Sequence, residues 1–137
     1  MSLVFLDTSG LIAVVNADDQ WYADAEAVWR QLIASNASLV TTSWVLVELG
    51  DGLSRIDQRH LALMLYDRLR NAPRIEIVPM TPAHEAAAWE LFRQRPDKQW
   101  GVTDCGSFVV MQQRGIDAAL TVDHHFKQAG FKRLISS

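Results

Sequence analysis

The strongest constraint on the fold is the alternation of short apolar segments with longer helical patterns. The first apolar segment, 3–6, ends abruptly at Asp7, as a buried parallel strand does where it enters a loop. Four more segments have strand character, the last of them at a sheet edge, and the five span residues 3–6, 38–42, 75–78, 118–122 and 131–135. This pattern predicts an α/β fold with a central, mainly parallel sheet of four or five strands flanked by helices.

Six helices are expected between these strands, because apolar residues recur there at helical spacing. Ser43 is expected to cap the helix that starts one residue later, and Thr103 the helix that stops at Gly115. The predicted helices span residues 11–15, 18–33, 44–53, 58–70, 82–94 and 103–114. On the second helix, the residues expected on the inner side are Ala23, Ala27 and Ile33.

The composition indicates one globular domain over residues 1–137. The chain is 49% hydrophobic and 21% charged, which is enough apolar material for a sizeable core. No apolar run approaches the roughly 18 residues that span a bilayer, and the N-terminus lacks the basic start of a signal peptide, so we expect a cytoplasmic protein with no membrane partner. Cys105 is the only cysteine, which excludes an internal disulfide and a structural thiolate zinc site.

Four acidic residues lie where acids are not expected, beside apolar segments. Asp7 and Asp123 each follow a predicted strand, and Asp104 opens the helix before the later of these strands. Glu48 lies in the apolar helical stretch 44–49, where an unpaired charge is costly. Because the carboxyl ends of parallel strands meet at one edge of a sheet, all four side chains can converge there.

Four carboxylates close together repel one another, and their pKa values rise unless a cation balances them. Oxygen ligands without a histidine or thiol cluster select Mg²⁺ or Mn²⁺, which suit phosphodiester hydrolysis. Taken singly, Asp7 can cap a helix, Asp104 can complement a helix dipole and Asp123 can stabilise a turn. The prediction of a metal site therefore depends on the set.

Four segments resemble the motifs of PIN-domain ribonucleases, in order and over nearly the whole chain. They are 5–9 (FLDTS), 44–49 (WVLVEL), 103–108 (TDCGSF) and 120–126 (LTVDHHF), the last followed by 129–131 (AGF). The resemblance implies a parallel sheet with flanking helices, and Mg²⁺- or Mn²⁺-dependent RNA cleavage that leaves 5′-phosphate and 3′-hydroxyl ends. The residues that fall on the family's catalytic and metal-binding positions are Asp7, Glu48, Asp104 and Asp123.

Many bacterial members of that family are toxins of the VapC kind, so the resemblance also implies a homodimer and a cognate antitoxin. The helical surface around Leu61, Met64 and Leu65 is a candidate contact for either partner. Two departures leave a non-toxin RNA-processing protein open as an alternative. Many toxins carry Asn where this chain has Ser9 or Gly10, and a hydroxyl residue often stands at the position of Gly101.

Further residues are candidates for contacts with RNA. Lys98 and Lys127 can meet phosphates, and Trp100 can stack on a base or pack inward. The pair His124-His125 suggests zinc, but adjacent residues point in different directions and no third nitrogen or sulfur ligand is near in the sequence. Local structural hydrogen bonding is therefore the expected role of the two histidines.

The formal net charge of −3 counts against an RNA partner, since nucleic-acid binders are often basic. All 13 Lys and Arg residues lie from Arg30 onward, and divalent ions at the four acids would cancel much of the negative charge. A haloacid-dehalogenase-type phosphatase would need an acid at the position of Ser9, and a phospho-receiver domain would need an acid paired with Asp7. A catalytically silent RNA-binding scaffold is the non-enzymatic alternative.

Overall fold

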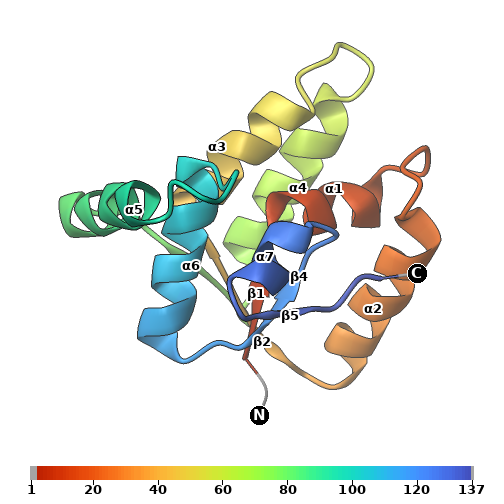
Figure 1. The fold of residues 1–137 in the computed structure, drawn as a ribbon. Coiled ribbons are helices and arrows are strands. Elements are labelled where there is room, and N and C mark those ends of the chain that lie inside the picture. The colour runs from red at the N-terminus through yellow and green to blue at the C-terminus, as the bar shows by residue number, and fades with distance from the viewer. Residues whose placement is uncertain (1–2, 137) are drawn as a thin grey trace.

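Five parallel strands form a single sheet in the computed structural model, which describes residues 3–136 (Figure 1). The spatial order is β3-β2-β1-β4-β5, and every neighbouring pair is parallel. The strands are β1 (Leu3–Leu6), β2 (Ser38–Thr42), β3 (Ile75–Val78), β4 (Ala118–Leu120) and β5 (Lys132–Arg133). The prediction of five mainly parallel strands is confirmed, with β4 and β5 shorter than predicted.

Within the described residues, seven helices connect the strands. They are α1 (Thr8–Val15), α2 (Tyr22–Ala34), α3 (Ser43–Gly52), α4 (Arg59–Asn71), α5 (Pro82–Gln94), α6 (Val102–Arg114) and α7 (His124–Gln128). Right-handed crossovers put α1 to α4 on one face of the sheet. After β3 the chain crosses back over the sheet to add β4 beside β1, so α5 to α7 lie on the other face. Figure 1 shows α2 and the pair α5–α6 on opposite sides of the strands. The described residues contain no helix long and apolar enough to cross a membrane.

Several predicted helix starts were wrong, in one case because the predicted capping side chain has a partner elsewhere in the fold. Thr42, rather than Ser43, caps α3 by accepting a hydrogen bond from the Val45 N–H, while the Ser43 hydroxyl accepts from the Met80 N–H. Helix α6 starts one residue earlier than predicted, and Gly101 rather than Thr103 occupies its N-cap position. Helix α7 was not predicted at all, since five residues give too short a pattern to recognise.

The inner face of α2 was also predicted wrongly. This helix begins at Tyr22 rather than at the Asp18-Asp19 pair, and its inner side is formed by Ala25 together with Val28, Trp29 and Leu32. Ala25 is fully buried, whereas Ile33 is 54% exposed. The predicted inner residues Ala23 and Ala27 also lie on the exposed side of the helix.

A glycine sets the distance between α1 and β4, the strand beside β1. A Cβ atom on Gly10 would lie 2.1 Å from the Leu120 carbonyl oxygen, a separation that no side chain can occupy. Helix α1 therefore packs directly on the end of β4. This contact brings the loop after β1 next to the loop after β4, at the position where the strand order reverses. In open parallel sheets this reversal point is where ligands bind.

Candidate functional site

Asp7 lies at the reversal point, directly after β1, and is only 4% exposed. The hydroxyls of Ser9 and Thr121 both donate hydrogen bonds to its Oδ2 atom, each at 2.8 Å. Burial raises the pKa of Asp7 to about 7, against the lowering effect of these two donors, and the charges of Asp104 and Glu48 raise it further. Although Asp7 precedes α1, its side chain makes no capping hydrogen bond, so the helix-cap explanation for this acid is wrong.

Glu48 lies on α3, the helix that directly follows β2. The Thr8 hydroxyl donates a short hydrogen bond to Glu48 Oε1, which fixes the side chain relative to the start of α1. Burial raises the pKa of Glu48, and the charges of Asp104 and Asp123 act in the same direction. Thr8 and Thr121 therefore act as supporting donors, to Glu48 and Asp7 respectively.

Asp104 and Asp123 complete the group from the opposite face of the sheet. Asp104 accepts the Gly101 N–H at 3.0 Å in the first turn of α6, and burial raises its pKa, with repulsion from Asp123 adding to the effect. Asp123 caps α7 by accepting the His125 N–H at 2.9 Å, while its own N–H donates to Thr121 Oγ1 at 3.0 Å. The local roles considered for these acids, Asp104 at a helix N-terminus and Asp123 at a turn, thus exist alongside their place in the cluster.

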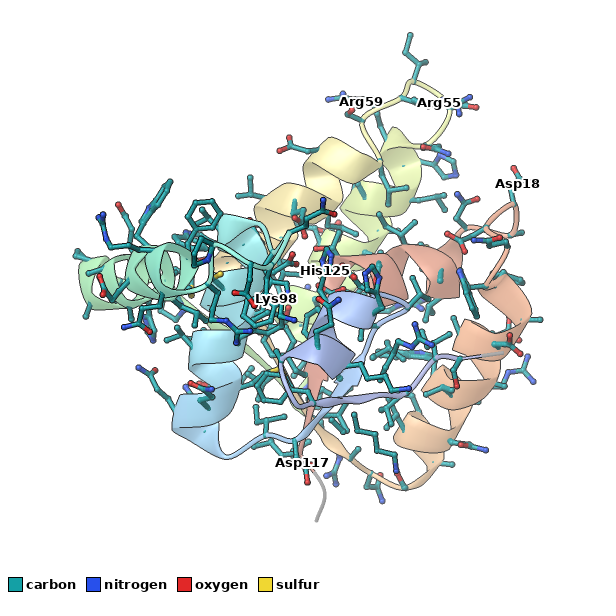
Figure 2. All side chains as sticks on the ribbon, viewed as in Figure 1. Asp18, Arg55, Arg59, Lys98, Asp117 and His125 are labelled. Atoms are coloured by element: carbon teal, nitrogen blue, oxygen red, sulfur yellow. The ribbon has the colours of Figure 1, made fainter. Side chains whose placement is uncertain are left out.

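The fold brings all four predicted acids to one edge, where their charges act on one another. Asp7 is affected by Glu48 and Asp104, and both of these by at least one further member of the set. None of the lysine and arginine ion pairs within residues 3–136 involves these four side chains. Figure 2 places Arg55 and Arg59 at the tip of the α3–α4 connection, away from His125. No lysine or arginine of the described residues therefore balances the charge of the cluster, and a cation would do so.

The donor set fits Mg²⁺ or Mn²⁺. Carboxylate oxygens are the ligands that these ions prefer, and the hydroxyls of Thr8, Ser9 and Thr121 hold two of the carboxylates in place. The four carboxylates do not form one closed cage. Within the described chain, no three of them bring ligand oxygens to within 4.8 Å of one another. Mg²⁺ usually keeps several waters and uses one or two carboxylates, so this wider spacing is compatible with it.

Burial of Asp7 leads to a prediction for the metal-free protein. Between about pH 4 and pH 7 the folded state retains the Asp7 proton and the unfolded chain has lost it, so the free energy of unfolding falls as the pH rises. The ceiling for this effect is about 4 kcal/mol. Thermal unfolding in chelator should therefore show a higher midpoint at about pH 5 than at about pH 8. Asp7→Asn should lose most of this difference, and an equal pH dependence in both proteins would contradict the prediction.

The three residues predicted to contact RNA differ in their exposure and contacts. Trp100 is only 5% exposed; its ring packs on Phe108, and its Nε1 donates to Gln128 Oε1 at 3.1 Å, so the prediction that it stacks on a base is wrong. Lys98 is half-buried, and its Nζ atom lies 3.9 Å from Asp97 Oδ2. Lys127 is exposed on α7, and its contact with RNA stays a prediction.

Sequence reasoning missed the role of Ser9, and it did not predict the contact between His125 and Asp104. Ser9 donates to Asp7 and also accepts the Val122 N–H, so it ties the loop after β1 to the loop after β4. The Nδ1 atom of His125 lies 3.4 Å from Asp104 Oδ2 and 3.3 Å from Asp123 Oδ1, between two of the acids. Its position two residues after Asp123 was the only available signal, and it does not reveal the proximity of Asp104.

Comparisons with known proteins agree with the overall fold. A family profile described as the PIN domain matches residues 4–132. The 23S rRNA-specific endonuclease VapC20 of Mycobacterium tuberculosis is 30% identical over 131 residues, which cover 94% of this chain and 95% of that protein. The crystal structure of the same relative, described as a Sarcin-Ricin loop cleaving toxin, superposes with a TM-score of 0.83 at 29% identity, covering 95% of this chain and 96% of that one.

Two more distant structures share the fold. One is VapBC2 of Rickettsia felis bound to a promoter DNA fragment, with a TM-score of 0.68, 18% identity and coverage of 95% of this chain and 96% of that chain. The other is FitAcB of Neisseria gonorrhoeae, with a TM-score of 0.67, 18% identity and 94% of both chains covered.

Proposed function

This chain belongs to the PIN-domain family, and on that premise we propose that it is an endoribonuclease that hydrolyses RNA phosphodiester bonds with Mg²⁺ or Mn²⁺. The observation that carries the proposal is the gathering of Asp7, Glu48, Asp104 and Asp123 at the reversal point, without a lysine or arginine paired to them in the described residues. An acid as buried as Asp7 is costly to ionise without a cation nearby.

The four carboxylates are proposed to hold the ions and to orient them toward the scissile phosphate. A divalent ion bound there makes water more acidic and stabilises charge on the phosphate oxygens. The hydroxyls of Ser9 and Thr121 aim Asp7, and the Thr8 hydroxyl aims Glu48. These hydrogen bonds fix the carboxylates before an ion arrives, which reduces the reorganisation that binding requires.

Removal of the metal tests the proposal directly. Cleavage of RNA should stop in excess chelator and return when Mg²⁺ or Mn²⁺ is restored. Calorimetric titration with Mn²⁺ should show binding in the native chain that Asp7→Asn abolishes. Cleavage that persists in chelator would overturn the metal-dependent mechanism, and retention of Mn²⁺ binding without cleavage of any RNA would favour a silent RNA-binding scaffold.

The substrate proposed first is ribosomal RNA. The relative that matches along the whole chain is named for 23S rRNA, and its crystal structure for the Sarcin-Ricin loop. An RNA stem-loop with the Sarcin-Ricin loop sequence is the appropriate first substrate, and a scrambled loop on the same stem is its control. Lys127, exposed on α7 just beyond Asp123, is proposed to contact the RNA backbone, and Lys98 is a weaker candidate because of its contact with Asp97.

The protein is further proposed to be the toxin of a toxin–antitoxin pair. Support comes from the whole-chain relative, which is described as a toxin, and from fold neighbours solved as VapBC and FitAB assemblies. The apolar residues first considered for partner contact need correction, because Leu65 is buried and Leu61 packs against the core. On the same helix, the exposed apolar residues are Leu63, Met64 and Tyr66.

A homodimer is proposed through the outer surface of α3 and α5. Val47, Trp89 and Phe92 are 65%, 51% and 43% exposed, and the two aromatic rings pack edge-to-face on α5. Exposed aromatic side chains of this kind are enriched at protein interfaces. Light scattering should give twice the mass of the 15.4 kDa chain, and Trp89→Glu should shift it toward the monomer. A native monomer at micromolar concentration would contradict this assignment.

A further inference from the structure

The strongest feature that the proposed nuclease chemistry does not use is the histidine pair after β4. In residues 3–136, one group of three potential ligand side chains has its donor atoms within 4.8 Å of one another, and it consists of Asp123, His124 and His125. The two imidazole centroids are 4.5 Å apart. The sequence-based argument that neighbouring histidines diverge is therefore wrong here, because the start of α7 turns both rings toward the carboxylate that caps it.

The separations between donor atoms fit a common ion. In a tetrahedral site with bonds of about 2.0–2.1 Å, two ligand atoms lie about 3.3–3.4 Å apart. The Nδ1 atom of His125 is 3.3 Å from Asp123 Oδ1, and that of His124 is 3.7 Å from the same oxygen. The His124 ring is 66% exposed, so it can turn by the small amount needed without disturbing packed residues.

The Nδ1 atom of His125 provides an independent observation. It is buried from solvent, and within the described chain it has no hydrogen-bond partner. A buried polar atom without a partner is costly and calls for an explanation, such as a bound ion. The same atom lies 3.4 Å from Asp104 Oδ2, but Asp104 is outside the group of ligand atoms that lie within 4.8 Å of one another in the described residues. Imidazole nitrogen prefers borderline transition ions over Mg²⁺, which takes oxygen ligands.

We propose that Asp123, His124 and His125 form a binding site for a divalent first-row transition ion with affinity for imidazole, represented experimentally by Zn²⁺. This site differs in chemistry from the oxygen-only cluster but shares Asp123 with it. One consequence rests on the proposed nuclease function. An ion held by the histidines withdraws Asp123 from the Mg²⁺-binding set, so Zn²⁺ opposes Mg²⁺-supported RNA cleavage.

The test measures Zn²⁺ binding directly, without RNA. Calorimetric titration of the full chain with Zn²⁺ in millimolar Mg²⁺ should show one site. The double variant His124→Ala/His125→Ala should weaken that site by on the order of 100-fold, and His124→Ala alone by about ten-fold. Co²⁺ in place of Zn²⁺ should give the visible absorption of a nitrogen-ligated ion, and this absorption should be absent in the double variant.

Matched controls separate this proposal from loss of fold and from the nuclease proposal. His60→Ala removes an exposed imidazole from α4 and should leave Zn²⁺ binding unchanged. Because His124 is exposed, His124→Ala should have the same thermal unfolding midpoint as the native chain when both are measured in chelator. Equal Zn²⁺ affinity in the native chain and both histidine variants would overturn the proposed site. The proposal would also be overturned if Asp7→Asn abolished Zn²⁺ binding while the histidine variants retained it. Because no RNA is present, these outcomes do not depend on nuclease activity.

Discussion

Asp104→Asn should reduce RNA cleavage by about three orders of magnitude or more while leaving the folded protein at least as stable as the native chain. The carboxylate of Asp104 is buried beside Asp123, and both burial and repulsion raise its pKa. Asparagine keeps the size of the side chain and its acceptor for the Gly101 N–H, but it removes one negative charge from the cluster. The loss is therefore expected in catalysis and metal binding, and not in folding.

Two measurements check the Asp104 prediction. Single-turnover cleavage of the ribosomal stem-loop gives the rate, and the thermal unfolding midpoint in chelator gives the stability. Asp97→Asn is a matched control, because Asp97 is an exposed acid that pairs with Arg95 and lies outside the cluster, and it should cleave at the native rate. If Asp104→Asn retained native activity, the four-carboxylate mechanism would be wrong. As a toxin, the native chain should arrest growth when expressed, and the variant should not.

Gly10→Ala should lower stability more than other substitutions of similar size. Its added methyl group would meet the Leu120 carbonyl oxygen at 2.1 Å, and a backbone atom in a sheet cannot move away as a flexible side chain can. Separating α1 from β4 also pulls Thr121 away from Asp7 and Val122 away from Ser9. Overpacking of this kind typically costs about 1–3 kcal/mol and occasionally more, so we expect a midpoint lower by roughly 10 °C.

Gly50→Ala is the matched control for this substitution. Gly50 lies within α3, and nothing is within 4 Å of the position its Cβ would take. Alanine there should raise stability by about 0.5–1 kcal/mol, because glycine is unfavourable within a helix. Opposite shifts of the two midpoints would show that the close approach of backbone at Gly10 is responsible. A Gly10→Ala protein with native stability and activity would show that β4 can move without cost.

Much of the fold was predictable because burial leaves a direct record in the sequence. A central parallel strand is covered on both faces, so 3–6 and 38–42 read as apolar runs, and chain direction then places the residues after them on one edge. Asp7 and Asp123 were found by that logic. Glu48 was found because an acid in an apolar helix needs a partner, and the fold supplies the Thr8 hydroxyl.

Contacts between distant segments were not predictable in the same way. Trp100 and Lys98 are similar candidates by sequence, but only the packing of Phe108 and Gln128 shows that the tryptophan ring is enclosed. In α2 several apolar residues offered alternative inner faces, and only the packing shows that Ala25, Trp29 and Leu32 face the core. Single caps were assigned to the wrong residue where a hydroxyl such as that of Ser43 had a remote partner available.

The sequence by itself determined the class of fold, the edge at which its acids meet and the kind of ion they suit, since periodicity and residue chemistry are local properties of the chain. Only the tertiary structure decided that Ser9 and Thr121 share Asp7 and that His125 lies between Asp104 and Asp123. These relations join residues up to 114 positions apart. The contact between Thr121 and Asp7 depends on how closely α1 approaches β4, a distance that no local pattern encodes.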